Sequence, residues 1–178
     1  MQIVIKLLTK TLFQTVLECI LCKIFYEIAG QKDKLDENSF EVIKIIRAPL
    51  KFVFDWCTDF RENDAEILGS NNKIQIVEKN ERQVIRLVES DTKFGVIKNR
   101  QVITLNPPNK WHVERVGDEA NISGDYELTE SDSHTNLKMK FRHEYNMPEF
   151  VQTTEKRRER FGMMWDNIIK ALENDYSK

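Results

Sequence analysis

Between residues 73 and 145 the chain repeats one pattern, a short run of alternating apolar and polar residues followed by a few turn-forming residues. The runs are KIQIVEK, QVIRLVES, VIKNRQVITL, WHVERV, ANISGDYELT and TNLKMKFRHEY. Alternation with a period of two is typical of strands that bury one face. The segments between the runs have the length and composition of hairpin turns. The sequence therefore predicts six consecutive antiparallel strands.

A further strand and two short helices are predicted before this region. The run FEVIKII, from Phe40 to Ile46, is rich in β-branched residues and favours a first strand. Proline prefers the first turn of a helix, so we expect an amphipathic helix over Pro49–Thr58. Asp59 is a suitable cap for a second short helix that begins at Phe60 and ends before Gly69.

The C-terminal segment predicts one long helix. Pro148 ends the last strand, and residues 149–176 then contain no helix-breaking proline. An open sheet cannot cover its own apolar face, and this helix is the element available to cover it. We therefore expect an α+β fold in which a curved seven-stranded antiparallel sheet wraps around the C-terminal helix. The apolar residues at helical spacing are Phe161, Trp165, Ile168, Leu172 and Tyr176.

This order of elements resembles the helix-grip fold of the START and birch-pollen-allergen-like superfamily, also called SRPBCC. The resemblance is carried by IIRAPLKFVFDWCTDF after the first strand, VITLNPPNKW at a later hairpin and FGMMWDNIIKALENDY near the end. The chain is most similar to the polyketide cyclase/dehydrase-like and coenzyme-Q-binding-like branches, over residues 39–176. The resemblance implies an apolar cavity between sheet and helix, which relatives use for lipids, polyketides, sterols or quinones.

Residues 1–29 are apolar but are interrupted by charges, and they precede a polar segment. A membrane-spanning helix needs about 20 largely uncharged residues, and no such window occurs here. We expect an extra amphipathic helix over 1–29 that docks on a protein surface, with peripheral attachment to a membrane as the alternative. Residues 30–38 favour a linker, and 39–178 the helix-grip domain. The interrupting charges are Lys6, Lys10, Glu18, Lys23 and Glu27.

Composition excludes several classes of function. Lys and Arg number 27 against 29 Asp and Glu, so nothing in the charge favours binding to nucleic acid. Three cysteines are too few for a disulfide scaffold and favour a reducing, cytoplasmic location. Cys19 and Cys22 have zinc-ligand spacing without a second pair of ligands, and the glycines form no phosphate-binding motif. We expect no metal and no cofactor.

The candidate ligand site follows from the faces of the last strands and of the long helix. His143 shares a strand face with apolar residues, whereas His112 is expected on the opposite face of the sheet and His134 in a turn. Residues 155–160, EKRRER, are expected on a solvated helix face. The residues expected to line the cavity are Trp56, Tyr126, Met139, Phe141, His143, Phe161, Met164, Trp165 and Ile168. The same residue types also fill ordinary cores, so this alternative stays open.

Three functions are consistent with these patterns. The leading hypothesis is binding or transport of a hydrophobic small molecule, such as a lipid, a polyketide or a quinone, because no catalytic constellation is evident. The second is a polyketide cyclase or dehydratase in which His143 acts as a base and Tyr126 donates a hydrogen bond. The third is a protein-interaction module, as in relatives that stimulate a chaperone ATPase.

Overall fold

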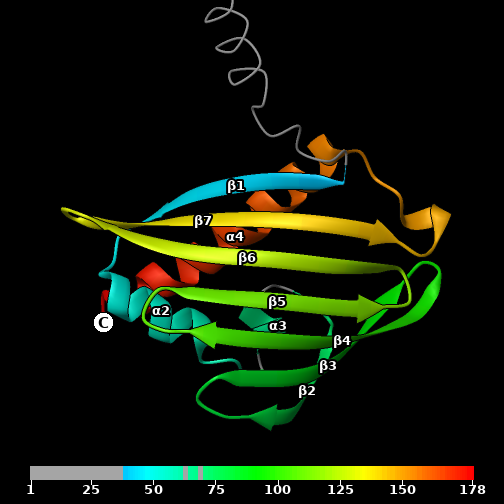
Figure 1. Cartoon of the computed structure of the whole chain (residues 1–178), viewed down its shortest axis with the longest axis horizontal. Helices are drawn as coiled ribbons and strands as arrows, with labels where there is room; N and C mark the ends of the chain where they lie inside the picture. Colours follow the sequence, from blue (N-terminus) through cyan, green and yellow to red (C-terminus); the bar gives the residue numbers. More distant parts are fainter. Residues whose placement is uncertain (1–37, 62–63, 68–69) are drawn as a thin grey trace, which may run out of the picture. The chain divides into compact units, whose positions relative to one another are not determined.

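A computed structural model describes residues 38–61, 64–67 and 70–178. Its seven strands form one sheet in the order β1-β7-β6-β5-β4-β3-β2, and every neighbouring pair is antiparallel (Figure 1). The predicted meander of six strands is confirmed, and the first strand pairs with the last one. The strands are β1 (Ser39–Ile46), β2 (Lys73–Lys79), β3 (Gln83–Thr92), β4 (Gly95–Asn106), β5 (Lys110–Gly117), β6 (Ala120–Ser131) and β7 (His134–Tyr145).

The strands extend further toward their turns than the alternating pattern indicated. His134 was expected in a turn, but it is the first residue of β7 and lies opposite Ser131 in the sheet. Only Asp132 and Ser133 remain for the turn itself. The prediction for His134 was wrong because pairing with β6 continues up to a two-residue connection.

The segment after β1 forms a helix and then a much shorter second one. Helix α2 covers Leu50–Thr58, with Pro49 as its N-cap, as predicted to within one residue. The second helix, α3, covers only Asp64–Ile67, so its predicted start at Phe60 was wrong. Asp59 ends α2 and binds Lys79 of β2, with 3.0 Å between Oδ1 and Nζ. That contact uses the carboxylate that was expected to cap the second helix.

The long helix α4 covers Thr154–Tyr176 and begins five residues later than predicted. Residues 148–150 form a separate 3₁₀ turn, η1 (Pro148–Phe150). Thr153 has an extended backbone, and its hydroxyl accepts a hydrogen bond from the backbone N–H of Lys156. This N-cap defines the start of the helix, and a cap of this kind is not visible in the apolar spacing alone.

Helix α4 packs along one face of the sheet, which is its inner face, and α3 is seen behind the strands in the same view (Figure 1). Residues from opposite ends of the chain therefore form one core. It includes Phe40 and Val42 of β1, Leu137, Met139 and Phe141 of β7, Leu128 of β6, and Trp165, Ile169 and Leu172 of α4. Phe40, Leu128, Leu137, Met139 and Leu172 have no exposed surface.

The basic run 155–160 is not uniformly solvated, as had been expected. Arg157 is 3% exposed, whereas the other five residues of the run are exposed. Its guanidinium carbon lies 5.9 Å from the centre of the Phe40 ring and 5.6 Å from that of Tyr145. Aromatic faces attract a cation, and this attraction holds Arg157 against the sheet.

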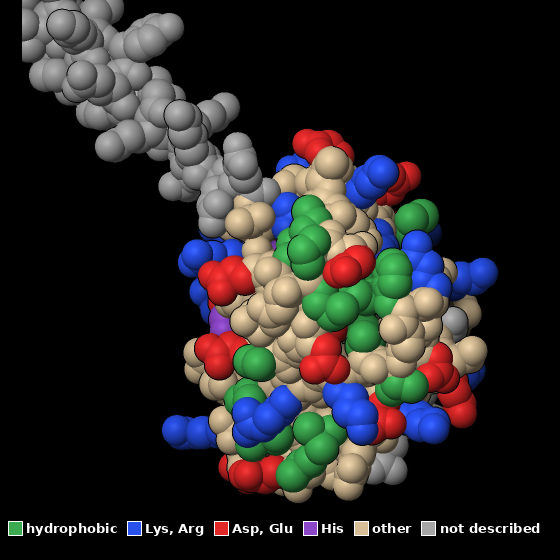
Figure 2. Space-filling view, turned by 90° about the vertical axis from the view of Figure 1, so that its right-hand side faces the viewer, with side chains coloured by type: hydrophobic (Ala, Val, Ile, Leu, Met, Phe, Trp, Pro, Cys, Tyr) green, Lys and Arg blue, Asp and Glu red, His purple; other side chains and the backbone are tan. Residues whose placement is uncertain are grey.

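The surface seen from the end of the sheet is mixed in character (Figure 2). Small groups of hydrophobic side chains there are separated by lysine, arginine, aspartate and glutamate (Figure 2). Within 38–61, 64–67 and 70–178, no helix is long and apolar enough to cross a membrane. The expected helix over 1–29, and the linker up to residue 37, lie outside the described residues.

The packing of α4 predicts a clear contrast between two positions on that helix. Leu172→Ala should lower the free energy of unfolding by about 2–5 kcal/mol, because it leaves a cavity where a side chain is completely buried. Met163→Ala, at a position that is 56% exposed, should change it by less than about 0.5 kcal/mol. Chemical denaturation of the purified variants measures both. Equal effects would show that α4 does not carry the core.

Candidate functional site

A cavity of about 270 Å³ lies between the inner face of the sheet and helix α4, next to α2 and α3. Most of its wall is aromatic or aliphatic. All three tryptophans of the chain contribute to it. The aromatic members are Trp56, Phe60, Trp111, Tyr126, Phe141, Phe161 and Trp165, and the aliphatic members are Ile67, Val113, Ile122, Met164 and Ile168.

The aromatic rings of this wall are packed on one another. Tyr126 stacks on Trp111 with 4.8 Å between ring centres and an interplanar angle of 12°. The edge of Phe141 meets Tyr126 at 5.6 Å, and Phe161 lies 4.5 Å from Phe141. Stacked and edge-to-face contacts of this kind stabilise the ring positions beyond simple burial. The cavity is therefore bounded by side chains that support each other.

Polar side chains cross the cavity wall in a single row. Arg86 of β3 is paired with Gln101 of β4, and Gln101 with Arg115 of β5. All three line the cavity. Side chains of directly paired residues lie on the same face of a sheet, so the row places two arginines on the inner face, two strands or roughly 10 Å apart.

Arg86 is held by two neighbours and faces the cavity. Its Nε donates to Gln101 Oε1 at 2.8 Å, and its Nη1 lies 3.4 Å from Asp64 Oδ2. Its guanidinium carbon is 5.0 Å from the centre of the Phe60 ring. Burial lowers the pKa of Arg86 and the charge of Asp64 opposes that effect. An arginine so placed stays protonated at neutral pH.

Two neutral side chains with a dissociable proton, the hydroxyl of Tyr126 and the thiol of Cys57, line the cavity. Burial raises the pKa of Tyr126 well above its usual value, and the positive charge of Arg86 partly offsets this. Burial also raises the pKa of Cys57 to about 12, and Asp64 adds to the effect. Cys57 is half-buried and lines the cavity. Both groups are protonated at pH 7 and act as donors.

Arg115 forms an ion pair with Glu119, which is itself 7% exposed. Burial, and then repulsion by Arg160 of α4, lower the pKa of Arg115 to about 10. The pair lies at the β5–β6 end of the wall. Each charge of this buried ion pair compensates the other, so loss of either residue would leave an uncompensated buried charge.

Seven of the nine residues predicted to line the cavity do so, namely Trp56, Tyr126, Phe141, Phe161, Met164, Trp165 and Ile168. Met139 and His143 do not lie on the cavity wall. Met139 is enclosed by the core, and His143 is 4% exposed, with its ring 5.5 Å from Phe40 and 5.6 Å from Phe161. The structure therefore separates His143 from Tyr126, with which it had been grouped.

Sequence reasoning missed the row of Arg86, Gln101 and Arg115. The signal was present, because Arg86 has the same parity as Val84 and Val88, and Arg115 the same parity as Trp111 and Val113. A charged residue at an inward position of an apolar alternation indicates a cavity or an ion pair. The predicted cavity residues of the sheet came only from its last two strands, so this row on β3, β4 and β5 was not included.

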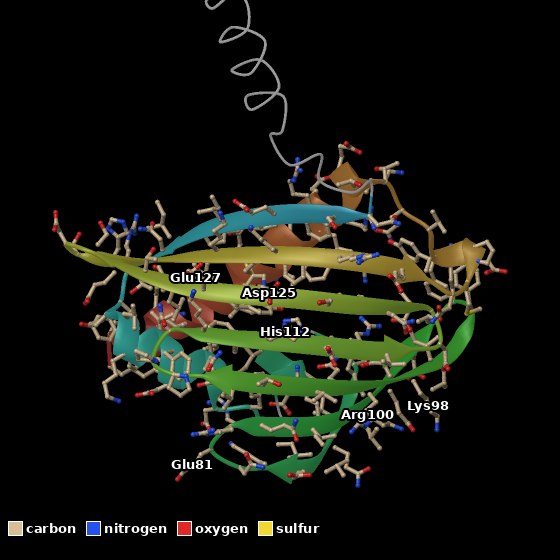
Figure 3. The ribbon with its side chains drawn as sticks, in the orientation of Figure 1. Glu81, Lys98, Arg100, His112, Asp125 and Glu127 are labelled. Carbon is tan, nitrogen blue, oxygen red and sulfur yellow. The ribbon has the colours of Figure 1, made fainter. Side chains whose placement is uncertain are left out.

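His112 lies on the outer face of the sheet, as expected, where it points away from α4 (Figure 3). Its Nδ1 is 2.7 Å from Asp125 Oδ1 on the neighbouring strand. In the described part of the chain, no group of three or more His, Cys, Asp or Glu residues could hold a metal ion. Cys19 and Cys22 lie outside that part.

No protein-family model matches the sequence, and no curated protein does either. Solved structures match over most of the chain. The aromatase/cyclase ZhuI from Streptomyces sp. R1128 is 14% identical, with a TM-score of 0.59, and the match covers 77% of this chain and 92% of that one. A START superfamily protein from Mycobacterium smegmatis is 13% identical, with a TM-score of 0.58, and the match covers 77% and 95%.

A third structure, Ara h 8.0201, is 13% identical, with a TM-score of 0.60, and the match covers 75% of this chain and 96% of that one. At this level of identity the three structures show the fold. The predicted helix-grip fold, an α+β fold in which a seven-stranded antiparallel sheet wraps around the C-terminal helix, is confirmed.

The environment of His143 predicts a pH dependence of stability. Burial, and then the charges of Arg157 and Arg115, lower the pKa of His143 from 6.5 to about 4. Below pH 6.5 the unfolded chain binds a proton that the folded chain does not. The contribution of His143 to the free energy of unfolding is therefore fully present above pH 6.5 and is lost as the pH falls toward 4.

His143→Leu should remove this contribution. Between pH 7 and pH 4.5, the wild type should lose roughly 2–3 kcal/mol more of its free energy of unfolding than the variant does. Urea denaturation at a series of pH values measures the difference. Parallel pH profiles for the two proteins would contradict the assignment of a neutral, buried imidazole.

Proposed function

We propose that this protein binds a hydrophobic small molecule in the cavity between its sheet and helix α4. The observation that carries the proposal is the cavity itself, whose wall consists mostly of aromatic and aliphatic side chains. Ligand pockets in proteins are concave and mostly apolar, with a few polar groups that orient the ligand. The wall has this composition, because its apolar side chains are interrupted by a smaller set of polar ones, namely Arg61, Asp64, Asn72, Arg86, Gln101 and Arg115. A protein-interaction module would need no such space in its core.

The size of the cavity bears on the kind of ligand. A volume of 270 Å³ equals that of about nine water molecules and is at the lower end of the range for ligand pockets. A compact, ring-containing molecule fits this space better than a long acyl chain does. The many aromatic side chains of the wall favour a ligand that is itself aromatic and planar, because aromatic rings pack well on one another.

A cyclase or dehydratase is the second candidate. Two observations favour it: one of the three similar structures described above is an aromatase/cyclase, and Arg86 and Tyr126 line the cavity. Acid catalysis needs a donor close to a ligand carbonyl, and Tyr126 supplies one. His143 does not fit the role of base in this reaction, because it lies off the cavity wall with an uncharged ring among Phe40, Tyr145 and Phe161.

Purified protein should carry its ligand if affinity is high. Native mass spectrometry followed by solvent extraction identifies any molecule that co-purifies. Turnover of that molecule by the wild type, lost in Tyr126→Phe, would favour the enzyme over the carrier. Binding without turnover would favour the carrier.

Filling part of the cavity should weaken binding without unfolding the protein. Val113 lines the cavity and lies opposite Gly124, so Val113→Phe should place a ring in the ligand space and weaken binding by about tenfold or more. The probe is 2-acetylnaphthalene, a neutral planar molecule, and isothermal titration calorimetry measures its affinity.

Val116→Phe is the matched control. It lies on the same strand, but its side chain is 63% exposed, and we expect it to leave the affinity for 2-acetylnaphthalene unchanged. Equal loss in both variants would indicate a general effect on folding. Unchanged affinity in Val113→Phe would place the ligand elsewhere and contradict the proposal.

A further inference from the structure

We propose that the ligand carries a negatively charged group, such as a carboxylate, which is bound by Arg86 and Tyr126. This inference rests on the proposed function and specifies the class of molecule that the cavity accepts. It predicts a planar, apolar acid in preference to a neutral molecule of the same shape.

The charged residues that line the cavity are mostly positive. Arg61, Arg86 and Arg115 line it, and Asp64 is the one acidic residue among the lining residues that the structure describes. Asp64 is shared, because Arg61 Nε and Arg86 Nη1 both lie 3.4 Å from its oxygens. Arg61 also lies 4.0 Å from Asp59, whereas the one ion pair of Arg86 among the described residues is the shared contact with Asp64. The charge of Arg86 is therefore incompletely compensated beside a largely apolar space, and an anion would complete its pairing.

The unused hydrogen-bonding groups of the wall are mainly donors. Arg86 uses Nε and Nη1, and its Nη2 makes no hydrogen bond to a described residue. The Tyr126 hydroxyl likewise has no hydrogen-bond partner in the described part of the chain, although it can also accept. The indole N–H of Trp165 is buried with no acceptor among the described residues. A ligand rich in acceptor oxygens matches this inventory, whereas a pure hydrocarbon leaves it unsatisfied.

Arg86 and Tyr126 supply a cation and a neutral O–H donor to the wall of the same cavity. The charge of Arg86 also acts on the Tyr126 hydroxyl and partly offsets the effect of burial on its pKa. An acid that enters the cavity therefore meets both groups.

Arg86 is oriented before any ligand arrives. Gln101 accepts its Nε–H, and the Gln101 amide in turn donates to Asn99 Oδ1 at 3.0 Å. Asn99 is 5% exposed, so this chain of hydrogen bonds ends at a buried residue of the sheet. An arginine held in place by two amides loses little conformational entropy on binding a carboxylate. The arrangement therefore favours an acid over a neutral ligand of the same shape, and it does not simply raise the affinity for every apolar molecule.

The test compares two probes that differ in a single group. In 2-naphthoic acid a carboxylate occupies the position of the acetyl group of 2-acetylnaphthalene. Calorimetry at pH 7.5 should show that the wild type binds the acid about tenfold or more tightly than the ketone, as expected for a charge-assisted hydrogen bond. Arg86→Gln should reduce the ratio of the two affinities to about one, because the amide keeps a hydrogen bond but carries no charge.

Arg100→Gln is the matched control, since Arg100 is exposed on the neighbouring strand on the outer face of the sheet (Figure 3). It should leave the ratio unchanged. Arg86→Met provides a second neutral variant if Arg86→Gln proves unstable, because Asp64 keeps its contact with Arg61 in both.

The outcomes separate this inference from the proposed function. If the wild type binds both probes with equal affinity, the cavity binds ligands but has no preference for an anion, and the inference fails alone. If Arg86→Gln keeps the preference for the acid, the assignment to Arg86 is wrong. If neither probe binds, the proposed function fails and the inference fails with it.

Discussion

One helix cannot cover a seven-stranded sheet, and the rest of the structure depends on this limit. Six spacings of about 4.8 Å make the sheet roughly 29 Å wide, whereas a helix with its side chains is about 10 Å across. Helix α4 therefore packs against β1, β7 and β6, where Phe40, Leu137 and Leu128 are fully buried. On β3, β4 and β5 the inner face borders the cavity, while α2 packs on β6 and β7 and α3 lies against β2.

The same limit explains why arginines occur on the inner face of the sheet. Where α4 covers the strands, most inward residues are apolar and buried, and no charged side chain of the sheet is enclosed there among the described residues. Where it does not, Arg86 and Arg115 occupy inward positions beside the cavity, each with a carboxylate partner. A charged group at a completely packed position would lose its hydration without compensation. The cavity and its ion pairs therefore occur on the same strands.

His143 illustrates how position within one sheet decides the role of a residue. It lies in the same cross-strand row as Arg86, Gln101 and Arg115, since Ile122 pairs with both Arg115 and His143. On β7, however, the row is covered by α4, and the imidazole is enclosed by aromatic rings with a pKa lowered to about 4. On β3 the row is open, and Arg86 lines the cavity.

The amino-acid sequence alone determined the strands, their antiparallel order and the helix that covers them, because alternation and helical spacing are local properties of the chain. It also placed most of the aromatic cavity wall, since the inward parity of Tyr126 and Phe141 can be counted along the strand. It did not locate the starts of α3 and α4, which depend on the contacts of Asp59 and Thr153. Only the tertiary structure decided which inward residues face the cavity and which are enclosed, because that depends on where a narrow helix lies across a wide sheet.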